Sequence, residues 1–316
     1  MQYQQLIYRL ILFAAILTSA DHSNAQPANA RFIDSTIYKI IKVKPSTADV
    51  SVTYWDSAHV VYYDPKIKNN SILLWLTGTG GTSNNVPTDF FKTALQQGYR
   101  VIALSFISVP AVAQLCMGDY LDANSNCAAD FRRRRIYGDN DFSLIKDEPQ
   151  DAIIPRLVKL LQYLTKNDIS GNWSLYLEKG MSKANWNKIA IAGQSQGGGM
   201  AQFIAQYENI LKVISFSGGW DYSNSRDKKI AGWYFNKNVT PMGNWYATYN
   251  INEPAANSLK EICDALHIPP DHIFALDKPL GNAAATASNP NPYHGDGIRN
   301  TAYQATWVAM LGNGLQ

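Results

Sequence analysis

The chain has 316 residues, of which 46% are hydrophobic and 17% are charged. This composition excludes an intrinsically disordered protein and is typical of one large globular domain. The formal net charge is only +3, and the basic residues are spread along the chain. A nucleic-acid binder would cluster them, so we expect a neutral small molecule or polymer as ligand and no nucleic-acid partner.

Residues 1–25 have the pattern of a secretory signal peptide. One basic residue, Arg9, precedes the apolar stretch 10–17, and small residues follow as far as Ala25. The apolar stretch is too short to span a bilayer, so no stable membrane anchor is expected. We predict a secreted or periplasmic protein whose mature domain is 26–316, with cleavage after Ala20 or Ala30 as alternatives.

The cysteines fit export. Cys116 and Cys127 lie close together in a polar stretch, and in an oxidising compartment they are expected to form a disulfide that closes a loop. The third cysteine, Cys263, lies in a helical pattern and is predicted to be buried and unreactive.

From about residue 59 onward, short apolar strands alternate with amphipathic helices. This alternation predicts an α/β fold with a doubly wound, mostly parallel sheet. A period near 3.6 marks a helix around 153–164, with Pro155 in its first turn, and another after residue 196. A final helix is expected at 299–311. The predicted strands are 59–63, 72–76, 101–106, 188–192, 213–216, 245–249 and 273–276.

The segment 108–148 interrupts the alternation and is long enough to be a functional excursion such as a lid. It carries four consecutive arginines at 132–135. In an exported protein we interpret them as a solvated face rather than a nucleic-acid patch, with one arginine tied to Asp130 or Asp139.

A nucleophile is indicated by the segment 193–197, Gly-Gln-Ser-Gln-Gly. Such a pattern is weak evidence alone, but here a buried strand precedes it and a helix follows, which is the nucleophile elbow centred on Ser195. Glycine gives the sharp turn room, and the helix dipole favours negative charge at the serine oxygen. The alternative, a phosphate-binding turn, lacks the lysine of a P-loop.

A serine hydroxyl needs a base to take its proton, so a histidine must come near it. Among five histidines, His294 is favoured because it lies in a turn-rich loop after the last predicted strand and before the last helix. That position fits the chain order serine, acid, histidine. The spacing of the histidines does not fit a metal site, so we expect no metal and no cofactor.

The acid is open among three residues. Glu253 is favoured because it follows the strand 245–249 and precedes a helix, although a carboxylate there also stabilises a helix start without any catalysis. Asp221, after the preceding strand, is the second candidate, and Asp277 is the third.

Acyl transfer also requires N–H donors for an oxyanion. The main chain of Gln196, directly after the nucleophile, is expected to supply one, and Thr79 or Gly80 in the loop 76–81 the other. A nucleotide-binding turn is the rival interpretation of that loop, but the loop lacks a third glycine at the proper spacing, and the next strand lacks an acidic residue. Trp220 and Tyr293 suggest an apolar acyl pocket, or they serve packing.

From about His59 to its end, the chain resembles the α/β-hydrolase superfamily. The segments 76–81 (Leu-Thr-Gly-Thr-Gly-Gly), 135–138 (Arg-Ile-Tyr-Gly) and 193–199 (Gly-Gln-Ser-Gln-Gly-Gly-Gly) are similar to a little-characterised bacterial group on the esterase and lipase side. Two features depart from the family pattern: Thr77 stands where many members have histidine, and Asn252-Glu253 replaces a clear aspartate.

The resemblance implies a secreted serine hydrolase that cleaves carboxylic esters of a small molecule or polymer through an acyl-enzyme. Two alternatives remain: an amidase or peptidase with the same triad, and a binding protein of this fold without turnover. The sequence leaves the oligomeric state open.

Overall fold

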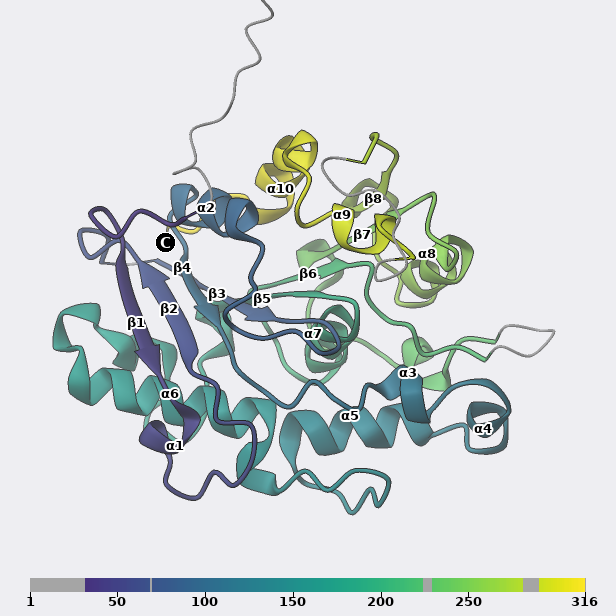
Figure 1. The fold of residues 1–316 in the computed structure, drawn as a ribbon, viewed down its shortest axis with the longest axis horizontal. Coiled ribbons are helices and arrows are strands. Elements are labelled where there is room, and N and C mark those ends of the chain that lie inside the picture. Colours follow the sequence, from purple (N-terminus) through teal and green to yellow (C-terminus); the bar gives the residue numbers. More distant parts are fainter. Residues whose placement is uncertain (1–31, 69, 224–228, 281–289, 316) are drawn as a thin grey trace, which may run out of the picture. The chain divides into compact units, whose positions relative to one another are not determined.

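The core of the fold is one open, mostly parallel β-sheet. The computed structural model describes residues 32–68, 70–223, 229–280 and 290–315, and within them eight strands lie in the order β1-β2-β4-β3-β5-β6-β7-β8 (Figure 1). Strands β3 to β8 are parallel, whereas β1 and β2 pair antiparallel with their neighbours. The strands are β1 (Lys39–Val43), β2 (His59–Tyr63), β3 (Ile72–Leu76), β4 (Arg100–Ala103), β5 (Ile189–Gln194), β6 (Lys212–Phe216), β7 (Trp245–Asn250) and β8 (Ile273–Leu276).

The predicted fold class is confirmed, and the strand predictions agree closely with it. The strands expected at 59–63, 72–76 and 273–276 have the observed bounds, and the other four differ at their ends. The strand β1 was not predicted. Its side chains are mostly exposed because it is an edge strand, so it lacks the apolar run that marks the central strands.

Helices cover both faces of the sheet. In β3, Leu73 and Trp75 pack with α2 and α10, whereas Leu74 and Leu76 point to the opposite face, which α5, α6 and α7 cover (Figure 1). This alternation follows from the two-residue period of a strand. The α-helices are α1 (Pro45–Ala48), α2 (Thr88–Gln96), α3 (Val112–Leu115), α4 (Gly118–Ala123), α5 (Cys127–Tyr137), α6 (Ile153–Asn167), α7 (Gln196–Tyr207), α8 (Ala256–Ala265), α9 (Tyr293–Asp296) and α10 (Gln304–Leu311).

Three helix predictions can be compared with the structure, and the helix expected after residue 196 is α7. The stripe around 153–164 is the buried face of α6, and Pro155 lies in its first turn. The final helix is shorter than the predicted 299–311. A 3₁₀ turn (Thr301–Tyr303) precedes α10, and the Asn300 side chain accepts the Ala302 N–H at 3.0 Å, which holds that turn.

The chain divides into Met1–Phe32 and a compact unit, Ile33–Gln316, which holds the whole sheet. The predicted signal peptide, 1–25, lies outside the described residues, so its boundary with the mature domain stays a prediction. No helix in the described ranges is both long and apolar enough to cross a membrane.

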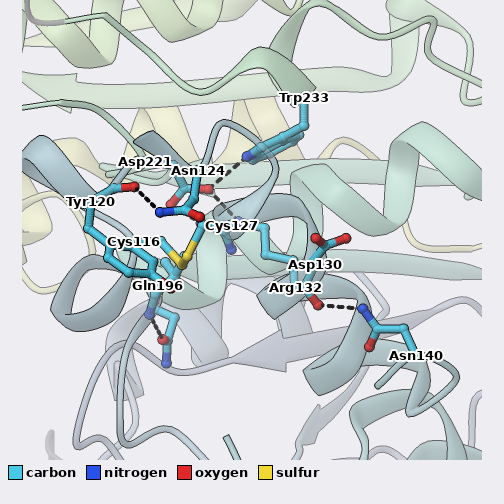
Figure 2. The surroundings of a disulfide bond; sticks show 11 residues. Cys116, Tyr120, Asn124, Cys127, Asp130, Arg132, Asn140, Gln196, Asp221 and Trp233 are labelled. Atoms are coloured by element: carbon cyan, nitrogen blue, oxygen red, sulfur yellow. Dashed lines mark hydrogen bonds and ion pairs between the residues drawn. A yellow bond between two sulfur atoms is a disulfide. The ribbon is translucent and has the colours of Figure 1, made fainter. Parts of the chain in front are cut away.

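The segment 108–148 forms α3, α4 and α5 and contains the predicted disulfide. Cys116 and Cys127 are bonded, with their Cα atoms 5.5 Å apart, and the bond joins the end of α3 to the start of α5 (Figure 2). Cys263 is buried as predicted, and burial raises the pKa of its thiol to about 12, which keeps it protonated and unreactive.

The expectation of a solvated arginine face was wrong for two of the four arginines. Arg132 and Arg135 are buried on α5, where Arg135 pairs with Asp147 at 2.5 Å. Arg133 does extend to the surface and pairs with Asp139 at 2.7 Å, one of the two partners expected. Residues three apart share a helix face, so Arg132 and Arg135 turn inward together.

Candidate active site

The site lies where parallel strands end side by side. Strand pairing aligns Leu76 of β3 with Gly193 of β5, and Gly193 with Ser215 of β6, and β7 pairs with β6 in turn. The loops that follow these strands therefore leave the same edge of the sheet. In open α/β sheets this carboxyl edge is where ligands bind.

Ser195 occupies a sharp turn between β5 and α7. Its φ of 56° lies in the left-handed region, which a serine adopts only when the surrounding structure holds it there. The turn is held by hydrogen bonds from Ser195 N–H to the Phe216 carbonyl at 2.9 Å and from Gly199 N–H to the Ser195 carbonyl at 3.1 Å.

Glycine is required on both sides of this turn. A Cβ added at Gly193 would overlap the main chain of Gly197, and one added at Gly197 would overlap the Leu76 carbonyl at the end of β3. The close approach of these main-chain segments leaves no space for a side chain. Ser195 is thereby presented at the N-terminus of α7, whose dipole favours negative charge.

His294 and Glu253 form a direct pair. The Nδ1 atom of His294, in α9, lies 2.8 Å from Oε2 of Glu253, which follows β7. The carboxylate is fully buried and the imidazole is 24% exposed. With Nδ1 paired to the carboxylate, Nε2 is the ring nitrogen that remains to accept a proton.

The His294 segment is attached to the turn that carries Ser195. The side-chain N–H of Gln194 donates to the His294 carbonyl at 3.1 Å. Gln194 directly precedes Ser195, so this bond brings the histidine segment to the elbow. No hydrogen bond joins the Ser195 hydroxyl to the His294 ring, although both residues are described. In enzymes without substrate this contact is often long and shortens only on substrate binding.

Asp221, the second candidate for the acid, has a different partner. Its carboxylate accepts two hydrogen bonds from Arg132, both at 2.6 Å, and a third from the Trp233 indole at 2.7 Å (Figure 2). Although burial opposes its charge, Arg132 has a raised pKa because Asp221 stabilises the guanidinium. Asp277, the third candidate, is exposed after β8.

Two of the three other histidines in the described residues have hydrogen-bond partners elsewhere. His59 is fully buried at the start of β2, where its Nδ1 accepts the Ser105 N–H at 2.9 Å. Burial, with the nearby Arg156, lowers the pKa of His59 to about 3, so it is a neutral acceptor. His272 makes a 2.9 Å contact with the Trp245 carbonyl through Nδ1, and His267 is exposed after α8.

The proposed oxyanion donors, Gln196 and Thr79, belong to two segments next to Ser195. Gln196 is the first residue of α7, where main-chain N–H groups have no partner within the helix. Thr79 is exposed in the turn closed by the Gly81 N–H to Gly78 carbonyl bond at 3.0 Å. A Cβ at Gly78 would be 3.3 Å from the Ser195 Cβ, so this turn passes directly beside the serine.

The two aromatic residues expected in an acyl pocket are half-buried near the pair. The Trp220 ring contacts the His294 ring edge to face, with centroids 4.8 Å apart, and its indole N–H donates to the Ser217 carbonyl at 2.9 Å. Tyr293 opens α9, directly before His294. Trp220 therefore has a packing contact with the histidine, and contact of either ring with a substrate stays a prediction.

Ser217 and Gln194 are two residues of this site whose contacts the sequence interpretation missed. The Ser217 hydroxyl donates to Oε1 of Glu253, and Gln194 holds the histidine segment. Their positions gave a signal, because each lies at or just after the carboxyl end of a central strand. Each residue contacts a partner far away along the chain, Glu253 for Ser217 and His294 for Gln194. No spacing pattern predicts such a contact.

Comparison with known proteins gives matches among solved structures alone, since no protein-family model and no curated protein matches the chain. An α/β-hydrolase from a Medee basin deep-sea metagenome library is 13% identical, covers 87% of this chain and 98% of its own, and has a TM-score of 0.43. Esterase B from Lactobacillus rhamnosis, inhibited by a tributyrin phosphonate, is 12% identical over 87% and 86%, with a TM-score of 0.46. A dienelactone hydrolase from Anabaena variabilis is 15% identical over 88% and 99%, with a TM-score of 0.44.

The structure itself shows an open, mostly parallel sheet with helices on both faces, and a strand, sharp turn and helix around Ser195. These are the features that the resemblance to the α/β-hydrolase superfamily predicts.

Proposed function

We propose that the protein is a serine hydrolase that cleaves carboxylic esters, with Ser195 as nucleophile, His294 as general base and Glu253 as the acid. The observation that carries the proposal is the 2.8 Å contact between His294 Nδ1 and Glu253 Oε2 at the edge of the sheet where the strained Ser195 turn lies. A buried carboxylate on one ring nitrogen leaves the other to take a proton, which is the arrangement that activates a serine.

In the first half of the reaction, the Ser195 oxygen attacks the ester carbonyl carbon while His294 Nε2 takes the hydroxyl proton. The tetrahedral intermediate carries a negative oxygen, which the main-chain N–H groups of Gln196 and Thr79 stabilise. Each such donor contributes on the order of 3 kcal/mol to the transition state. The C–O bond to the leaving alcohol then breaks, and His294 returns its proton to that alcohol.

In the second half, water attacks the acyl-enzyme. His294 takes a proton from the water, a second tetrahedral intermediate forms and collapses, and Ser195 leaves with the proton from the imidazolium. Glu253 holds the ring orientation and stabilises the imidazolium in both halves. The substrate supplies both the acyl group and the leaving alcohol, and every proton passes through one imidazole.

We also propose that the chain is exported. The Cys116–Cys127 disulfide supports this, because such bonds persist in oxidising compartments and are rare in the cytosol. The signal-peptide pattern of residues 1–25 supports it independently.

Replacement of the nucleophile tests the enzymatic proposal. Ser195→Ala is expected to abolish labelling by a fluorophosphonate probe and to lower kcat on short p-nitrophenyl esters by a factor on the order of 10⁶. Ser174→Ala is the matched control, since Ser174 is exposed in the 3₁₀ turn Trp173–Tyr176, and it should keep full activity.

Three outcomes would contradict the proposal. Labelling that persists in Ser195→Ala would refute the nucleophile. A wild-type protein that turns over the matching anilides faster than the esters would favour an amidase, and one inert to both would be a binding protein.

A further inference from the structure

The loop after β6 begins with a strained serine. Ser217 follows Phe216, the last residue of β6, and has a φ of 43° in the left-handed region. Its main-chain N–H donates to the Thr248 carbonyl of β7 at 2.7 Å. The residue is only 5% exposed. A serine in this conformation is strained, and the surrounding contacts must offset the strain.

The Ser217 hydroxyl contacts the carboxylate that pairs with the histidine. It donates to Oε1 of Glu253, and the Asn250 N–H donates to the same oxygen at 3.1 Å. The other oxygen, Oε2, lies 2.8 Å from His294 Nδ1. The two carboxylate oxygens therefore have separate partners: two donors hold one of them, and the imidazole takes the other.

The same loop also contacts the imidazole. Trp220, three residues after Ser217, packs its ring against the His294 ring. Its indole N–H donates a hydrogen bond to the Ser217 carbonyl at 2.9 Å. Ser217 is thus connected to both Glu253 and His294, to the first through its hydroxyl and to the second through Trp220.

We propose that Ser217 is a positioning residue of this site, whose hydroxyl fixes the Glu253 carboxylate so that Oε2 faces His294. The inference rests on the proposed function of the Ser195, His294 and Glu253 group. A glutamate has three side-chain torsions, and hydrogen bonds to one oxygen are what restrict them in a buried site. Without the hydroxyl, Oε1 keeps only the Asn250 N–H, and the carboxylate holds the imidazole less well.

Two substitutions separate the hydroxyl from the backbone conformation. Ser217→Ala and Ser217→Gly both remove the hydroxyl, but glycine adopts a positive φ without strain. We expect both to lower kcat on a p-nitrophenyl ester about tenfold, with KM within twofold, because one hydrogen bond to a charged group is lost. Full activity in Ser217→Gly alone would assign the role to the backbone and overturn the proposal.

Coupling to Glu253 distinguishes positioning from a merely structural role. If Ser217 acts through the carboxylate, adding Ser217→Ala to Glu253→Ala should change kcat no further, since the group it holds is gone. A second tenfold loss in that background would mean that Ser217 acts elsewhere, and it would overturn the proposal.

Ser215→Ala is the matched control. Ser215 lies two residues earlier on β6, is 1% exposed, and its hydroxyl has no hydrogen-bond partner in the part of the chain that the structure describes. Its kcat should stay within twofold of wild type. Wild-type protein without Ser195-dependent ester hydrolysis would overturn both proposals, whereas Ser195-dependent hydrolysis with full kcat in both Ser217 variants would overturn only this one.

Discussion

The loops after β6 and β7 leave the same edge of the sheet, and each carries a buried carboxylate. Asp221, after β6, is held by Arg132, and both side chains are fully buried. Glu253, after β7, is held by Ser217 and Asn250 and faces His294, which is partly exposed. Two carboxylates that are buried to a similar extent thus have different partners, an arginine for Asp221 and a histidine for Glu253.

The partner decides what each carboxylate can do. A guanidinium stays charged at any working pH, so Asp221 is in a permanent pair whose disruption leaves a buried charge uncompensated. An imidazole can take up a proton and release it again, so Glu253 faces a group whose charge can change during the proposed reaction. Under the proposed function, Asp221 serves stability and Glu253 serves chemistry, and mutations at each residue test that division.

The largest expected effect is on activity at Glu253. Glu253→Gln keeps the shape of the side chain but removes its charge, so the imidazolium loses its stabilising partner, and kcat should fall by about 10⁴-fold. Ester hydrolysis at saturating substrate measures it. The exposed Glu261→Gln on α8 is the control. An active Glu253→Gln enzyme would remove Glu253 from the mechanism.

The next effect is on stability at Asp221. Asp221→Asn leaves Arg132 buried without a counter-charge, which should lower the free energy of unfolding by about 3–5 kcal/mol, while kcat per folded molecule is unchanged. Urea unfolding followed by tryptophan fluorescence measures it. Asp139→Asn breaks the exposed Arg133 pair instead and should cost at most about 1 kcal/mol. A large loss of kcat in Asp221→Asn without destabilisation would reverse the assignment.

A smaller effect is expected at the disulfide, which anchors the start of α5, the helix that carries Arg132. The double variant Cys116→Ser/Cys127→Ser opens a loop whose ends are 11 residues apart, which should cost about 2–3 kcal/mol of stability. Thermal unfolding measures the loss, and kcat should change little. Equal melting temperatures for the oxidised and the dithiothreitol-reduced wild type would show that the bond contributes nothing.

Patterns of apolar residues and glycines within short segments predicted much of this fold, because they indicate which parts of the chain are buried. Apolar runs marked the central strands, and glycines around Ser195 marked the elbow. The same logic missed β1, whose residues are exposed. Chain order was enough to favour His294 and Glu253, which the structure brings within 2.8 Å of each other.

Pairings between side chains far apart along the chain were beyond such patterns. Arg132 meets Asp221 across 89 residues, and Ser217 meets Glu253 across 36. These contacts depend on how α5 packs on α7 and how β6 lies beside β7, which no single segment encodes. The helical period of α5 did hold one unused signal, since it puts Arg132 and Arg135 on the side of the buried Ala128.

Gln196 has two separable parts. Its main-chain N–H is the proposed oxyanion donor, and its buried carboxamide accepts the Val112 N–H at 3.0 Å and donates to the Ser108 carbonyl at 2.9 Å. Every substitution except proline keeps the main-chain N–H and removes or alters the carboxamide. Substituting all amino acids at this position would therefore measure how much activity depends on the carboxamide contacts with Ser108 and Val112. It would not test the main-chain N–H as a donor.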